Sequence, residues 1–160
     1  MEISENSRVW IYQANRPFSN SETVQIEQTL NTFTNGWHAH EHKLAAKAEV
    51  RYNRFIILMV DESVAGASGC SIDKSSQVIR ELEQKYNVSL FDRFNMAYKK
   101  GEEVISCSRQ EFEELLQRGE ITPETTVFNN TVQTKEDLET RWEVPFKYSW
   151  HSVVFQALVS

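Results

Sequence analysis

The longest apolar run in the chain, Phe55–Val60, limits what the rest of the sequence can build. A strand with one exposed face alternates apolar and polar residues, so an unbroken run such as this one suits a strand that is covered on both faces. The run is far too short to cross a bilayer as a helix. We therefore expect a buried strand inside a folded domain and no membrane span.

Composition places the chain among ordinary globular proteins. It has 160 residues, of which 40% are hydrophobic and 25% charged, values typical of one compact domain. The formal net charge of −6 repels phosphate backbones and anionic lipid surfaces, so we expect no nucleic acid and no membrane as partner. The first residues carry no secretory signal, and Cys70 and Cys107 suit free thiols in a reducing compartment. We predict a soluble, cytoplasmic, single domain of residues 1–160.

Residue patterns predict a strand and then a helix at the start of the chain. β-Branched and aromatic residues favour a strand over Arg8–Ala14. The capping-box pattern Ser19–Glu22 then starts a helix, at Ser19 or Ser21, that runs through Thr34.

Two interpretations compete for Trp37–Arg51. Its alanine, lysine and glutamate content favours a helix, whereas the alternation of apolar and polar residues from Leu44 to Val50 favours a strand. We prefer the strand. The turn-like pair Tyr52-Asn53 would then join it to Arg54–Asp61 as a hairpin.

The later elements follow from the same patterns. A glycine-containing loop after Asp61 leads into a helix from about Asp73 to Tyr86. The other predicted elements are a hairpin of Phe94–Tyr98 and Val104–Cys107, a capped helix from Ser108 to Gly119, a helix start at Thr122–Glu124, a helix over Thr134–Trp142 before Pro145, and an ambiguous segment, Trp150–Val159.

The order strand, helix, strand, strand, helix, strand is that of the split βαβ or ferredoxin-like arrangement. We therefore predict an α+β fold with an antiparallel sheet and helices packed mainly on one face. A further strand and C-terminal helices extend this βαββαβ order.

Three of the four histidines lie in the short segment Trp37–His42. On an extended strand His38, His40 and His42 point to one face, so the row would lie at the edge of the core. Imidazoles at i and i+2 can chelate one divalent metal ion. The alternative is a solvated histidine-rich loop, which we favour because the Cys and His spacings of typical zinc sites are absent. A divalent metal is the one cofactor that the pattern suggests.

Cys70 is the main candidate nucleophile. It follows a glycine-containing loop at the start of a predicted helix, where amides and the helix dipole stabilise a thiolate. His40 would be its base and Asp73 a neighbouring acid, although a cysteine in a tight glycine turn is commonly an apolar filler. A phosphate-binding loop needs glycine before Lys74, and this chain has Asp73 there. We expect no nucleotide.

Aromatic and histidine side chains concentrate near the C-terminus. We expect this tail to fold back onto the sheet, with a homodimer contact as second choice, because aromatic residues also mark binding surfaces. The residues are Trp142, Phe146, Tyr148, Trp150, His151 and Phe155.

Seven short motifs along nearly the whole chain resemble an uncharacterised family of small Bacteroidetes proteins. Members often carry the label "ABC transporter ATPase", but this chain has no Walker A motif and no Ser-Gly-Gly signature, so the resemblance implies no activity. The motifs are Val9–Gln13, Trp37–His40, Arg54–Ile56, Val60–Glu62, Ala67–Asp73, Val127–Asn130 and Ser149–His151.

A local stretch, Glu111–Phe128, is similar to small GYF-like peptide-binding modules. The likeness rests on a short helix, Gly119–Ile121, Pro123, Thr125 and Val127, and the Gly-Pro element of those modules is absent. It implies a peptide-binding or assembly role.

These observations favour a module that binds a small molecule or a protein. The alternative is a metal- or thiol-dependent enzyme whose site joins His38 and His40 to the turn Cys70–Asp73. The enzyme hypothesis predicts that the histidine segment and the glycine turn line one cleft. The module hypothesis predicts a solvated histidine loop and an exposed aromatic patch elsewhere.

Overall fold

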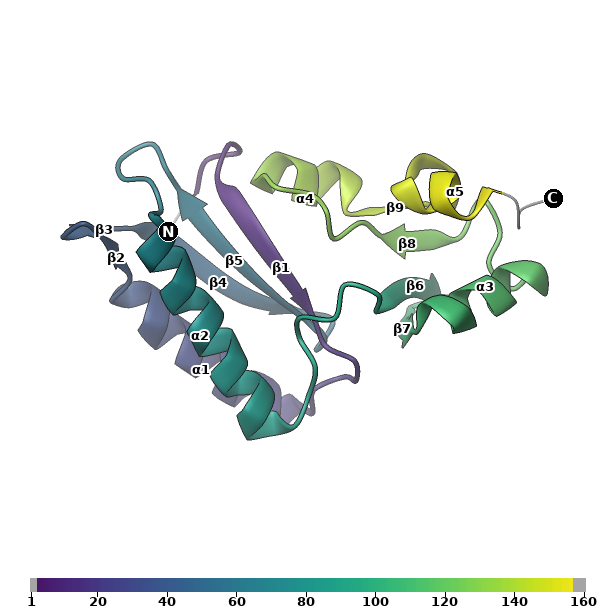
Figure 1. The fold of residues 1–160 in the computed structure, drawn as a ribbon, viewed down its shortest axis with the longest axis horizontal. Coiled ribbons are helices and arrows are strands. Elements are labelled where there is room, and N and C mark those ends of the chain that lie inside the picture. Colours follow the sequence, from purple (N-terminus) through teal and green to yellow (C-terminus); the bar gives the residue numbers. More distant parts are fainter. Residues whose placement is uncertain (1–2, 157–160) are drawn as a thin grey trace. The chain divides into compact units, whose positions relative to one another are not determined.

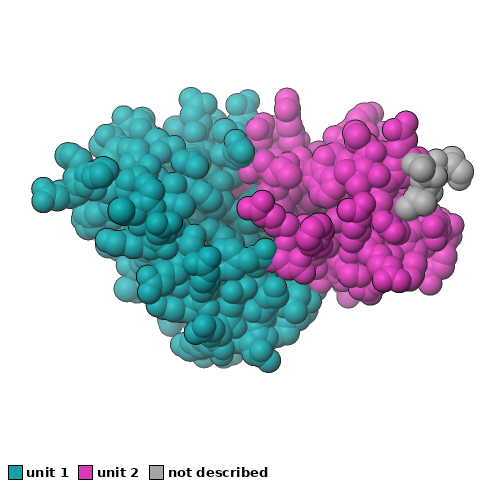
Figure 2. All heavy atoms as spheres, in the orientation of Figure 1, with its two compact units in different colours: residues 1–91, 133–136 teal, residues 92–132, 137–160 magenta. Residues whose placement is uncertain are grey.

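A computed structural model describes residues 3–156 and confirms the α+β class. The chain divides into two compact units (Figure 2). The described part of unit 1 is residues 3–91 and 133–136, and that of unit 2 is residues 92–132 and 137–156. Each unit has its own buried cluster instead of the one core expected for the chain. Compact units with separate cores need not fold separately, so the single domain of residues 1–160 stays a prediction.

Unit 1 is built on a three-stranded antiparallel sheet (Figure 1). Its strands are β1 (Arg8–Gln13), β4 (Ala45–Arg51) and β5 (Phe55–Asp61), in the order β1-β5-β4. The apolar run forms the central strand as expected, and every side chain of Phe55–Val60 is at most 2% exposed. The prediction of a hairpin between β4 and β5 is confirmed.

Two long helices, α1 (Asn20–Asn35) and α2 (Gly69–Tyr86), cover one face of this sheet (Figure 1). Ser19 caps α1 through the predicted capping box. The second helix begins at Gly69 rather than near Asp73, because the Ser68 hydroxyl accepts a hydrogen bond from the Ser71 amide at 3.1 Å. The Ser71 hydroxyl in turn accepts one from the Ser68 amide at 2.7 Å, so the cap is reciprocal.

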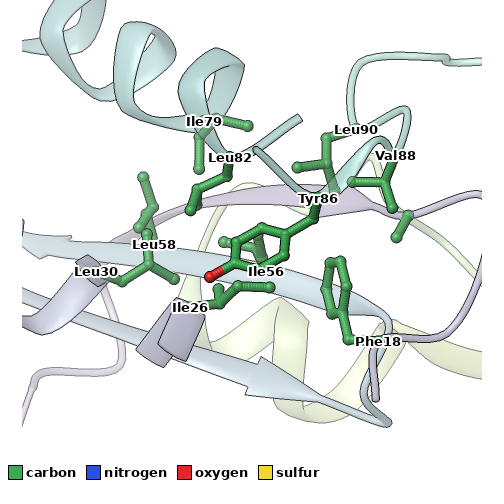
Figure 3. Close-up of a cluster of buried hydrophobic side chains, with 11 residues drawn as sticks. Phe18, Ile26, Leu30, Ile56, Leu58, Ile79, Leu82, Tyr86, Val88 and Leu90 are labelled. Carbon is green, nitrogen blue, oxygen red and sulfur yellow. The ribbon is translucent and has the colours of Figure 1, made fainter. Parts of the chain in front are cut away.

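The core of unit 1 lies between these helices and the sheet. Ile56 and Leu58 of β5 meet side chains from both helices, and the Tyr86 ring lies in the middle of the cluster in this view (Figure 3). The Tyr86 hydroxyl reaches Gln25 at 2.9 Å, which gives this partly polar residue a hydrogen bond at the rim of the core. The helix residues that complete the layer are Ile26, Leu30, Ile79 and Leu82.

The strand after α2 does not join this sheet. The predicted βαββα order holds for the three strands of this sheet and the two helices, but β6 (Met96–Lys100) pairs with β7 (Glu103–Cys107) in unit 2. A tight turn with Gly101 at φ 64° favours this local hairpin. The start of the outer edge of β1 is paired instead by residues 133–136, where the Val9 amide donates to the Gln133 carbonyl at 3.0 Å.

Unit 2 contains a four-stranded antiparallel sheet, in the order β7-β6-β8-β9. The other two strands are β8 (Thr126–Phe128) and β9 (Glu143–Pro145). The helical elements are α3 (Arg109–Gln117), α4 (Lys135–Arg141), which begins in unit 1, the 3-10 helix η1 (Phe146–Tyr148), and α5 (Trp150–Val154).

The core of unit 2 packs Phe112 of α3 against Phe146 and Phe155, with ring centroids 6.1 and 5.1 Å away. The capping box at Ser108 is confirmed. A predicted helix start at Thr122–Glu124 is wrong, because the Thr122 amide donates to the Thr125 hydroxyl at 2.9 Å and closes a turn that leads into β8. No helix within residues 3–156 is long and apolar enough to cross a membrane.

Candidate functional site

The histidine segment forms a short hairpin, not a continuous strand. Its strands are β2 (His38–Ala39) and β3 (His42–Lys43). His40 and Glu41 make the turn with φ of 50° and 70°, the backbone of a two-residue type I′ connection. His38 pairs with Lys43 and Ala39 with His42, so the expectation that the three imidazoles share one face is wrong.

All three histidines of this hairpin are exposed. His38 makes a local contact, with Nδ1 2.7 Å from the Gly36 carbonyl. Within residues 3–156, no three His, Cys, Asp or Glu side chains are grouped so that they could hold a metal ion. The metal assignment of His38, His40 and His42 therefore stays a prediction without support from the geometry.

The base of the hairpin is fixed to unit 1 by Trp37. Its side chain is 1% exposed and its indole N–H donates to the Ser71 carbonyl at 2.8 Å. The rings of Phe33 and Trp10 lie 4.9 and 6.1 Å from it. The buried indole therefore ties the histidine hairpin to the first turn of α2.

Cys70 lies in that same first turn and is exposed. Asp73 is exposed one turn later. Among the described residues, no hydrogen bond or ion pair joins either side chain to His40, although the Trp37 to Ser71 hydrogen bond makes the two segments neighbours. The catalytic roles of Cys70, Asp73 and His40 stay predictions. Cys107 is buried, and burial together with the Glu111 charge raises the pKa of its thiol to about 12.

Unit 2 contains a buried serine and histidine pair that the sequence did not suggest. Ser149 Oγ lies 2.6 Å from His151 Nδ1. The two residues are 5% and 1% exposed, and burial lowers the pKa of His151 to about 4. The imidazole stacks on Trp150 with centroids 3.8 Å apart. The ring also packs against Phe112, with centroids 5.6 Å apart, so it fixes α5 to the core of unit 2.

A small open pocket lies beside this segment on unit 2. Its volume is about 270 Å³, and Pro123, Phe146, Lys147, Ser152 and Gln156 line it. The chain neighbours of two of these residues, Tyr148 and Val153, are 73% and 74% exposed.

Lys147 is the one charged residue among the described residues that line the pocket. Lys147 Nζ lies 2.9 Å from a Glu124 carboxylate oxygen and 5.1 Å from the centre of the Tyr148 ring. This ion pair raises the pKa of Lys147. The aromatic C-terminal stretch and the GYF-like stretch with Pro123 were the signs of this surface in the sequence.

Comparisons with known proteins add no family. No family model, no curated protein and no solved structure matches this chain. The proposal below therefore rests on the geometry of unit 2.

Proposed function

We propose that the protein is a protein-binding module that receives an apolar side chain of a peptide segment in the unit 2 pocket. The observation that carries the proposal is the exposure of Tyr148 and Val153, the chain neighbours of Lys147 and Ser152 in the pocket lining. Large apolar side chains at such exposure on one short segment are typical of interaction sites. Val154, 48% exposed, extends the same surface.

The size of the pocket favours a peptide over a small molecule. Pockets for drug-sized ligands usually enclose about 300–1,000 Å³ and bury most of the ligand, whereas this pocket holds about 270 Å³ and is open. A space of this size suits one anchoring side chain. The flanking aromatic and aliphatic side chains would then cover the rest of an extended segment.

Three further observations support this proposal. The likeness of Glu111–Phe128 to GYF-like modules includes Pro123, which lines the pocket. Both cysteines are free, which agrees with action in the reducing cytoplasm. The exposed histidine hairpin is the arrangement that the module hypothesis predicted.

The test is a titration followed by amide NMR shifts, with capped tripeptides of the form Ac-Ala-X-Ala-NH2 as probes. We expect X = Leu, Phe or Trp to shift the amides of Lys147, Ser152 and Gln156, and X = Ser to leave them unchanged. Equal shifts with the serine peptide, or shifts confined to other residues, would overturn the proposal.

Two variants sharpen the test. Tyr148→Ser and Val153→Asp should each weaken binding of the best tripeptide about tenfold, equivalent to about 1.4 kcal/mol, because each removes an exposed apolar side chain adjacent in sequence to a residue of the pocket lining. The matched control is Val64→Asp, an 85% exposed valine of unit 1. This control should bind like the wild type.

A further inference from the structure

The free edge of the unit 1 sheet has a regular pattern of backbone groups. The Ala14 amide donates to the Arg54 carbonyl at 2.8 Å, and this register continues along the pairing of β1 with β5. Backbone groups of successive residues in an antiparallel strand point to alternate sides. The even-numbered residues of β5 therefore bond to β1, and the odd-numbered ones bond to β4.

The same alternation fixes which groups of β4 are free. The odd residues of β5 are opposite Ala45, Lys47, Glu49 and Arg51. Consequently Ala46, Ala48 and Val50 direct their N–H and C=O groups away from the sheet. No hydrogen bond between residues 3–156 uses these groups.

We propose that β4 pairs antiparallel with β4 of a second copy of this chain, around a twofold axis at Ala48. Ala48 would be opposite the partner's Ala48, and Ala46 opposite the partner's Val50. All of these residues present free backbone groups, so they would form the hydrogen-bonded pairs of the new ladder. The two sheets would become one continuous six-stranded sheet.

Charge complementarity selects a second copy as the occupant. In this register Lys47 is opposite the partner's Glu49, and Glu49 is opposite the partner's Lys47. These are non-hydrogen-bonded pairs, in which opposed side chains lie closest and opposite charges stabilise. Glu49 already accepts an ion pair from Arg51 at 2.7 Å, so the partner's lysine would complete a three-charge cluster on each side of the axis.

The other sheet edges lack this self-complementarity. Residues 133–136 pair with the start of β1, at Arg8 and Val9, and the rest of the strand, Trp10–Gln13, has no charged residue to form such a pair. If β7 paired with β7 of a second copy around Ile105, Glu103 would lie opposite the partner's Cys107, and no charge pair would form. β9 ends in Pro145, which has no amide hydrogen to donate.

A central lysine also has a simpler explanation, because natural edge strands often use lysine to prevent pairing. The two explanations differ in the response to charge exchange. If Lys47 only prevents pairing, replacing Glu49 should have no effect on association. The proposed pairing, in contrast, depends equally on the charges of Lys47 and Glu49.

The experiment measures the mass of the full-length protein by sedimentation over a concentration series. We expect a reversible dimer for the wild type. Lys47→Glu and Glu49→Lys should each weaken the dimer at least tenfold, because each places like charges opposite one another. The double variant K47E/E49K should restore it. An equimolar mixture of the two single variants should form a heterodimer, since every opposed pair then has opposite charges.

Controls separate this edge from other surfaces and from misfolding. Lys74→Glu makes the same charge change at an exposed position of α2 and should leave the dimer intact. Val153→Asp should also leave it intact, which separates the edge from the unit 2 pocket. Ala48→Pro, which removes an outward-pointing amide hydrogen, should abolish pairing while far-UV circular dichroism is retained.

Two outcomes would overturn the proposal. One is a wild-type protein that stays monomeric up to about 1 mM, the range of very weak complexes. The other is a dimer whose dissociation constant is unchanged in Lys47→Glu and in Glu49→Lys. Recovery of the dimer in the mixture supports the proposed register even if one single variant is less stable.

Discussion

Lowering the pH from about 7.5 to about 4.5 should destabilise the protein through the buried imidazole of His151. Burial lowers its pKa from 6.5 to about 4. In the unfolded chain this imidazole takes up a proton below pH 6.5, while the folded protein excludes the proton until about pH 4. The contribution of the neutral ring to stability is therefore full above pH 6.5 and is lost as the pH falls toward 4.

The size of the effect follows from the shift. Each pKa unit corresponds to about 1.4 kcal/mol, so a shift from 6.5 to about 4 gives about 3 kcal/mol in total. Between pH 6.5 and about 4.5 the expected loss is about 2–3 kcal/mol. The assay is urea unfolding at a series of pH values, analysed for the free energy of unfolding.

A double variant, S149A/H151F, isolates this contribution. It removes the hydrogen-bonded pair together and keeps an aromatic ring against Trp150 and Phe112. Ser149 makes no side-chain cap to α5, so no helix cap is lost. Acidic groups with lowered pKa, such as Glu22 at about 2, are present in both proteins and cancel in the difference. An equal acid loss in wild type and variant would refute the reasoning.

Three other predictions concern the two units. In the folded protein Cys70 should react with iodoacetamide and Cys107 should react only after unfolding, because the first thiol is exposed and the second is buried with a raised pKa; mass mapping that shows equal labelling would contradict this. Leu58→Ala should reduce the free energy of unfolding by about 2–5 kcal/mol, since this core side chain is 0% exposed, whereas a loss below about 1 kcal/mol would mean that the site collapses around the gap. His40→Gly should raise the free energy of unfolding by up to about 1 kcal/mol, because φ 50° suits glycine better than histidine; lower stability in urea unfolding would show that the imidazole makes a net favourable interaction.

Local signals predicted most elements of the fold. The capping boxes at Ser19 and Ser108 give helix starts that the structure confirms, because serine and a glutamate three residues later are a specific pattern. The box at Ser68 was missed because its third residue is Ser71. Serine in place of glutamate gives no such pattern in the sequence.

Long-range pairing could not be predicted in the same way. Nothing in residues 133–136 marks them as neighbours of β1, and the pairing uses backbone groups that every residue has. The prediction of a continuous strand through the histidine segment was wrong for a different reason. Its turn consists of two residues with positive φ, and neither of them is the glycine that usually marks such a turn in a sequence. The unit 2 pocket combines Pro123 with Phe146 and residues after it. The aromatic cluster and the GYF-like stretch each indicated one part of it, but no local pattern shows that the two parts meet.

The return of residues 133–136 to β1 has a consequence for how the protein is made. Unit 1 is discontinuous in the chain, so its first 91 residues leave the ribosome before the segment that pairs the β1 edge exists. During that interval the nascent sheet has two open edges, and open edges are where chains associate wrongly. Unit 2 must be synthesised through Val132 before unit 1 can be completed. Slowing translation between these positions should therefore raise aggregation more than slowing it after Glu136.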